Sequence, residues 1–122
     1  MRADADLEDA RRAAALAARQ SWLGVTSGMA QVKALEAARL SSTSALEANR
    51  LGYEVGVRIN IDVLNAQTQL ADTLLQLSRA RYDTLLAQLR LKAAAGTLGE
   101  DDIAAINALL EPAPPAPSQR KP

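Results

Sequence analysis

The sequence predicts an all-α fold, consisting of one long antiparallel helical hairpin, a short third helix and a disordered, proline-rich tail. Three observations support this prediction. The stretch from about residue 4 to 54 is dominated by Ala, Leu, Arg and Glu, which are good helix formers, and the stretch from about 61 to 95 repeats apolar and small residues every seven positions. A short connection around Gly56 separates them, and all five prolines fall within residues 112–122. Because a short turn between two long helices makes an antiparallel hairpin, we expect a single exposed tip.

The first stretch, from about residue 4 to 54, contains no Pro. A helix of about 50 residues is roughly 75 Å long, which is typical of a coiled coil or a helical wall. Residues at alternating spacings of three and four predict the seam that faces the second helix: Val25, Gly28, Val32, Leu35, Arg39, Ser42, Leu46, Asn49 and Tyr53. The polar members of this seam argue against a two-stranded leucine zipper.

The connection between the helices has its own signals. Gly56 can adopt the left-handed conformation that closes a helix. Asn60 is a candidate N-cap for the second helix, and Asp62 would lie in the first turn, where the helix dipole favours an anion. Four β-branched residues keep the connection extended and give it an apolar outer surface: Val55, Val57, Ile59 and Ile61.

The second helix should run from about residue 61 to 95. Two ladders with a seven-residue repeat lie three positions apart and predict one seam of large and small side chains. The ladders are Val63, Leu70, Leu77, Thr84, Leu91 and Ala66, Thr73, Ala80, Ala87, Ala94. Further apolar residues widen this surface, so the helix should pack against more than one neighbour.

The segment after the hairpin is shorter and more polar. Gly96 should end the second helix, and Thr97 and Glu100 have the spacing of a capping box for a third helix that reaches Leu110. We therefore divide the chain into a hairpin over 1–96 with its tip at about 55–61, a short helix within 97–111, and a disordered or polyproline-like tail over 112–122.

Composition excludes several functions. The 14 basic and 14 acidic residues give a formal net charge of zero, which argues against nucleic-acid binding and against a polybasic membrane anchor. The chain has no His and no Cys, so most zinc sites, haem ligation by His and Cys or His catalysis are excluded. We expect no enzyme activity, no cofactor and no metal. The cluster Glu100, Asp101 and Asp102 is interpreted as charge at a helix N-terminus.

Arg58 and Asp62 are the most distinctive charged residues near the tip. One interpretation is a local ion pair at a helix start, which stabilises a structure by about 0–1 kcal/mol when exposed. The other is a contact between subunits that controls a gate. Tyr53 lies about one helical turn before the break, within reach of the same region. The residues alone leave both interpretations open.

A resemblance adds to this interpretation. The motif Tyr-x-x-Gly-x-Arg-x-x-x-Asp-Val-Leu, at residues 53–64, resembles the periplasmic-tip signature of the TolC family of outer-membrane efflux and secretion channels. Three further segments, at residues 65–70, 79–86 and 89–98, are similar in kind and in order. The similarity extends from about residue 20 to residue 110.

The resemblance implies more than the composition does. Such channels are homotrimers with an outer-membrane β-barrel and a long periplasmic α-helical barrel, and they work with a periplasmic adaptor and an inner-membrane transporter. This chain would supply the last long hairpin of the helical barrel and the helix near its equator. We expect a C-terminal fragment of a longer outer-membrane protein, with this segment in the periplasm and the membrane strands missing.

The resemblance also implies roles for particular residues. Tyr53, Arg58 and Asp62 match positions that hold the channel's entrance closed or line it. One departure concerns Asn65, where well-known members carry a second aspartate, so a second acidic ring at the entrance is in doubt. The remaining positions match the tip surface that meets the adaptor: Gly56, Val57, Arg58, Ile59 and Asn60.

The alternative to a channel component that exports small molecules or proteins is a soluble coiled-coil hairpin that acts as a scaffold or adaptor. Periplasmic adaptors also contain long hairpins, but lipoyl-like β segments flank them, and this chain has none. A signal peptide and strand-rich segments upstream in the parent gene would distinguish a channel from a scaffold.

Overall fold

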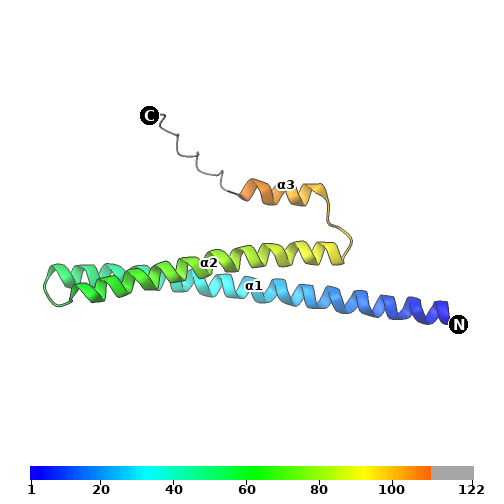
Figure 1. Cartoon of the computed structure of the whole chain (residues 1–122), viewed down its shortest axis with the longest axis horizontal. Helices are drawn as coiled ribbons and strands as arrows, with labels where there is room; N and C mark the ends of the chain where they lie inside the picture. Colours follow the sequence, from blue (N-terminus) through cyan, green and yellow to red (C-terminus); the bar gives the residue numbers. More distant parts are fainter. Residues whose placement is uncertain (111–122) are drawn as a thin grey trace, which may run out of the picture.

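The computed structural model describes residues 1–110 of the 122-residue chain, and these form three helices. They are α1 (Arg2–Glu54), α2 (Asn60–Ala94) and α3 (Glu100–Leu109). α1 and α2 form the long antiparallel hairpin, and α3 turns back over α2 at the end away from the tip (Figure 1). The predicted all-α hairpin is therefore confirmed, and the tail predicted over 112–122 lies outside the described residues.

The two hairpin helices differ in length. α1 has 53 residues and α2 has 35, which correspond to roughly 80 Å and 50 Å at 1.5 Å per residue. α1 therefore continues past the end of α2 (Figure 1). Every residue from 2 to 17 is exposed, and the first half-buried side chain of α1 is Ala18.

The core is a single line of contact between α1 and α2. Its buried apolar residues are Leu46, Leu77 and Ala80, and Leu77 is only 2% exposed. Thr73 and Thr84 are buried polar members of the same line. Both predicted ladders on α2 face α1, because all of their residues except the exposed Ala94 are buried or half-buried.

The seam on α1 differs from the prediction at two positions. Arg39 and Tyr53 are exposed, and the preceding small residues, Ala38 and Gly52, are half-buried and buried in their places. A guanidinium in the seam would lose water without gaining a partner, whereas a small residue allows the helices to approach. The other predicted seam residues of α1 are buried or half-buried.

Gly56 ends α1 with a φ of 82°, in the left-handed region, as predicted. The N–H of Val57 donates to the Gly52 carbonyl at 2.9 Å, and the N–H of Gly56 donates to the Tyr53 carbonyl at 3.1 Å. This pair of bonds is the Schellman motif, which satisfies carbonyls that the helix end would leave free.

Gly96 closes α2 in the same way, with a φ of 72°. The N–H of Thr97 donates to the Lys92 carbonyl at 2.9 Å, and the N–H of Gly96 donates to the Ala93 carbonyl at 3.1 Å. Both predicted glycine stops are therefore confirmed.

The predicted start of α2 was wrong by one residue. Asn60 is the first helical residue, and the N-cap is Ile59. Asp62 Oδ2 accepts a hydrogen bond from the Ile59 N–H at 3.2 Å. Because the third helical residue supplies this bond to the N-cap amide, the N-cap position needs no polar side chain of its own.

The start of α3 follows the same pattern and overturns the predicted capping box of Thr97 and Glu100. The N-cap is Gly99, and its N–H donates to Asp102 Oδ2 at 3.1 Å. Thr97 instead bonds back to α2, with its hydroxyl 3.4 Å from the Lys92 carbonyl.

Candidate functional site

The tip consists of the turn between Glu54 and Asn60, and all of its residues are exposed. Val57 is 75% exposed and Ile59 is 63% exposed, with Val55 and Ile61 also open to solvent. These apolar side chains do not pack into the core of the hairpin. The apolar outer surface that the sequence predicted is therefore present at the tip.

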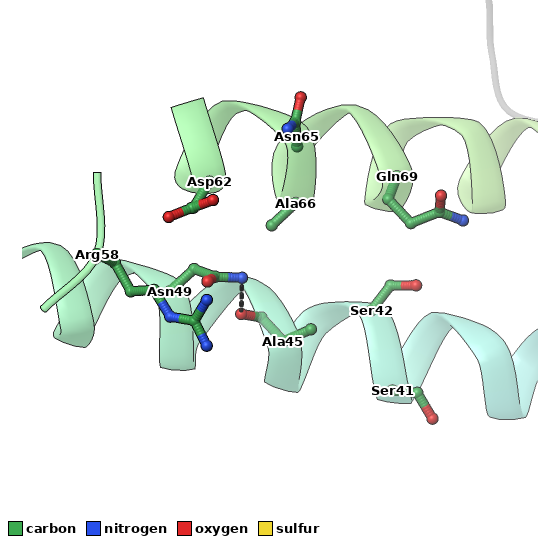
Figure 2. Close-up of a pocket in the computed structure, with 9 residues that line it drawn as sticks. All are labelled: Ser41, Ser42, Ala45, Asn49, Arg58, Asp62, Asn65, Ala66 and Gln69. Carbon is green, nitrogen blue, oxygen red and sulfur yellow. Dashed lines mark hydrogen bonds between the residues drawn. The ribbon is translucent and has the colours of Figure 1, made fainter. Parts of the chain in front are cut away.

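A polar groove lies between α1 and α2 directly behind the tip (Figure 2). We call it the tip groove. Its walls are mainly small, hydroxyl and amide side chains, with one cation and one anion, and its lining is Ser41, Ser42, Ala45, Asn49, Arg58, Asp62, Asn65, Ala66 and Gln69. The turn supplies only Arg58, so this side chain folds back from the tip into the groove.

Arg58 and Asp62 line the same groove without pairing. Within residues 1–110 no ion pair joins them, and Figure 2 shows the Arg58 side chain against α1, beside Asn49, while the Asp62 carboxylate stays at the start of α2. Asp62 instead accepts the Ile59 N–H. The interpretation of the two residues as a local ion pair is wrong for this structure, and each charge remains available to other partners.

Asn65 and Tyr53 differ in whether they line the tip groove. Asn65 lines the tip groove with Arg58 and Asp62. Tyr53 does not line it and is 52% exposed, so its hydroxyl does not join the same cluster within the hairpin.

Sequence reasoning missed Gly52 as part of this site. Gly52 is buried, and a Cβ built on it would lie 2.5 Å from Cγ of Arg58 and 3.4 Å from Cγ2 of Val57. The signal in the sequence was a glycine in the last turn of a long helix, where glycine weakens the helix unless another group needs the space.

The seam behind the tip groove contains polar side chains whose hydrogen-bonding groups have partners. Thr73 donates its hydroxyl hydrogen bond to the Gln69 carbonyl at 2.8 Å, and its oxygen lies 3.5 Å from Ser42 Oγ. Every buried side-chain polar atom in the described part of the chain has a hydrogen-bond partner. Small hydroxyl residues therefore occupy the seam without the cost of a buried unsatisfied group.

α3 is attached to α2 by charge. The Lys92 ammonium pairs with the Asp102 carboxylate. This hydrogen bond and the one from the Gly99 N–H lower the pKa of Asp102 below its ordinary value. Beyond this link, Leu109 and Leu110 at the end of α3 border a second groove on the hairpin, which Met29, Tyr82 and Leu85 also line.

Among residues 1–110, no helix has an apolar stretch long enough to cross a bilayer. In the same range, no group of three or more His, Cys, Asp or Glu side chains is placed to hold a metal ion.

Comparison with known proteins identifies the family. The model of the outer membrane efflux protein family matches residues 1–97. The chain belongs to the outer membrane efflux protein family. The match covers α1, the tip and α2, so family membership rests on the hairpin that carries the tip groove.

Sequence identity to named proteins supports the same family assignment. The chain is 39% identical over 121 residues to outer membrane protein TolC of Salmonella enteritidis, covering 98% of this chain. It is 38% identical over 105 residues to TolC of Escherichia coli K12, covering 86% of this chain. It is 36% identical over 98 residues to alkaline protease secretion protein AprF of Pseudomonas aeruginosa, covering 80%. The chain spans only 25%, 21% and 20% of these relatives' own lengths.

Proposed function

We propose that this chain forms one periplasmic hairpin of a trimeric outer-membrane channel that exports small molecules or proteins in a tripartite efflux or type I secretion system. The observation that carries the proposal is a hairpin of the outer membrane efflux protein family whose tip gathers Arg58, Asp62 and Asn65 in one groove. Similarity to TolC and to the protease secretion protein AprF supports both kinds of export.

The hairpin's surface supports assembly with other helices. Its own seam buries only a few residues, while large apolar side chains remain exposed on both helices, such as Leu23, Leu40, Leu74 and Leu86. Exposed apolar surface of this extent marks a contact with another protein or another subunit. Neighbouring helices on both sides, as in a closed barrel, would cover it.

The gate in this proposal consists of Tyr53, Arg58 and Asp62. Within the hairpin Arg58 has no acidic partner among residues 1–110, and Tyr53 is exposed and does not line the tip groove. In this proposal both would make contacts with a neighbouring subunit that hold the entrance closed. Asp62, at the start of α2, would line the constricted entrance.

The mechanism in this proposal is passive and involves no catalysis. A closed tip held by polar contacts opens when an adaptor binds the open form more tightly, by a shift of population. The exposed tip surface, from Gly56 to Asn60, would meet a periplasmic adaptor through its apolar side chains. An inner-membrane transporter would supply the substrate, and the protein would lie in the outer membrane with this hairpin in the periplasm.

The proposal is tested by single-channel conductance of the full-length protein in planar bilayers. Arg58→Glu places an anion against acidic neighbours, so the closed state should loosen and conductance should rise. Arg79→Glu is the matched control, because Arg79 is exposed on α2 away from the tip groove. Conductance that stays at the wild-type level in Arg58→Glu would show that Arg58 does not gate the channel.

A further inference from the structure

We infer that Gly52 is a positioning residue for Arg58: its missing side chain leaves the space through which the arginine folds back from the tip into the groove. The inference about geometry stands on the hairpin alone. Its consequence for gating rests on the proposed function.

Two hydrogen bonds attach the tip turn to Gly52. Its carbonyl accepts from the N–H of Val57 at 2.9 Å and from the N–H of Arg58 at 3.0 Å. These two bonds therefore hold the backbone of the turn against Gly52. Arg58 leaves the turn at a point already fixed relative to the last turn of α1.

The side chain of Arg58 then crosses the space where another residue would carry its Cβ. A Cβ on Gly52 would lie 2.5 Å from Cγ of Arg58 and 3.3 Å from Cβ of Arg58. Separations under about 3.0 Å between such atoms do not persist, and the atom in conflict is the second carbon of the side chain rather than its flexible end. Any residue other than glycine at position 52 forces Arg58 to rotate about its first bond or the turn to shift.

Either response moves the guanidinium. Among residues 1–110, Arg58 and Asp62 are the only charged residues that line the tip groove, and the other walls are small or neutral. Rotating the first side-chain torsion swings the guanidinium away from α1 and from its place beside Asn49 (Figure 2). Gly52 therefore sets where the positive charge of the tip is held, although it touches no ligand.

Gly24 of α1 provides a control, because the space around it is free. Gly24 also lies inside α1, and a Cβ built on it would meet no atom within 4 Å. Ala is a better helix former than Gly at both positions. A difference between Gly24→Ala and Gly52→Ala therefore reports the contact with the turn and not the helix itself.

The test is hydrogen–deuterium exchange of the full-length protein, followed by mass spectrometry of peptides that cover residues 51–62. Gly52→Ala should speed exchange of the Val57 and Arg58 amides severalfold, because relief of the contact opens the bonds to the residue 52 carbonyl. Gly24→Ala should leave these amides unchanged. In an Arg58→Ala background, which lacks the conflicting Cγ, Gly52→Ala should have little effect.

Several outcomes would overturn the inference. One is unchanged exchange at the tip in Gly52→Ala. Another is an acceleration of the same size with and without Arg58. If Gly52→Ala fails to assemble, the double variant with Arg58→Ala should restore assembly, and failure of both would equally count against the inference.

Conductance separates this inference from the proposed function. If Arg58 gates the channel, Gly52→Ala should raise conductance as Arg58→Ala does, and should add nothing to it. Exchange coupled to Arg58 without any change in conductance would leave the positioning role intact and reject the gate. An exchange pattern independent of Arg58 would reject the positioning role, whatever the conductance.

Discussion

Gly28 of α1 and Thr84 of α2 lie closer together than any residue with a side chain at position 28 would allow. A Cβ on Gly28 would lie 2.6 Å from the Thr84 hydroxyl oxygen, which is fixed because it donates to the Ala80 carbonyl at 2.7 Å. The two helices meet here through a glycine and a buried threonine. This contact fixes the spacing of the hairpin far from its tip.

Gly28→Ala should therefore weaken the hairpin, despite the better helix propensity of Ala. Overpacking of a well-packed contact costs about 1–3 kcal/mol. Gly24→Ala has the same helix gain without the contact, so the free energy of unfolding of the two variants should differ by that amount. Denaturant unfolding of the full-length protein, followed by far-UV circular dichroism, measures the difference. Equal stabilities would mean that the Gly28–Thr84 contact relaxes freely.

The 122-residue chain expressed alone should be poorly folded or should self-associate. Its seam buries little, and apolar side chains such as Leu16, Trp22 and Leu23 are more than half exposed. A two-helix hairpin has too little core to offset the entropy of ordering the chain. Analytical ultracentrifugation should give a weight-average mass above the 12.9 kDa monomer, or circular dichroism should show reduced helix. A cooperative melt of a monomer in dilute solution would contradict this prediction.

The attachment of α3 should weaken in acid. Lys92 and the Gly99 N–H lower the pKa of Asp102 below its ordinary value of 3.8. The stabilisation is therefore present above that value and is lost as the pH falls through the lower pKa of the folded state. Protection factors of amides in residues 100–109, corrected for intrinsic exchange, should fall in this range.

Two variants make the pH test specific. Lys92→Met should remove most of the additional loss of protection in acid, because the carboxyl loses its main partner. Asp101→Asn is the control, since Asp101 is an exposed neighbour in the same first turn and forms no ion pair within residues 1–110. A loss of protection that is identical with and without Lys92 would assign the pH dependence to another group.

Asn65 should weaken cation block of the proposed channel. Asn65 lines the tip groove with Asp62, and a neutral amide at this position leaves one acidic side chain per subunit in the groove. Asn65→Asp should strengthen block by added divalent cations, and Asp62→Ala should reduce it, as measured by conductance of the full-length protein. Strong block that persists in Asp62→Ala would show that the cations bind elsewhere.

Much of the fold could be predicted from local chemistry. Gly56 and Gly96 are the residues for which a left-handed conformation is least costly, so both helix ends were predictable. The ladders on α2 were also predictable, because small and apolar residues repeat there without interruption. The helix starts were not, since Asp62 and Asp102 reach backwards to Ile59 and Gly99, which carry no polar side chain.

The site was harder to predict than the fold. A local ion pair between Arg58 and Asp62 was one interpretation of the sequence, but Arg58 lies in the turn and Asp62 in the helix, so their separation in the sequence does not fix how close they lie. The seam contains Ala38 where Arg39 was predicted, for a similar reason. The periodic pattern fits either residue, and the cost of burying a guanidinium favours Ala38. Gly52 was missed because its importance depends on a side chain that folds back from the next element.

The part of α1 that extends past α2 has a consequence for how assembly can be followed. Residues 2–17 are all exposed in the described chain, so contacts from outside the hairpin would be needed to bury them. Protection of the backbone amides in this segment from hydrogen exchange should therefore increase when the hairpin associates with another helix. Trp22, which lies close behind this segment and is 57% exposed, offers an intrinsic fluorophore for the same event.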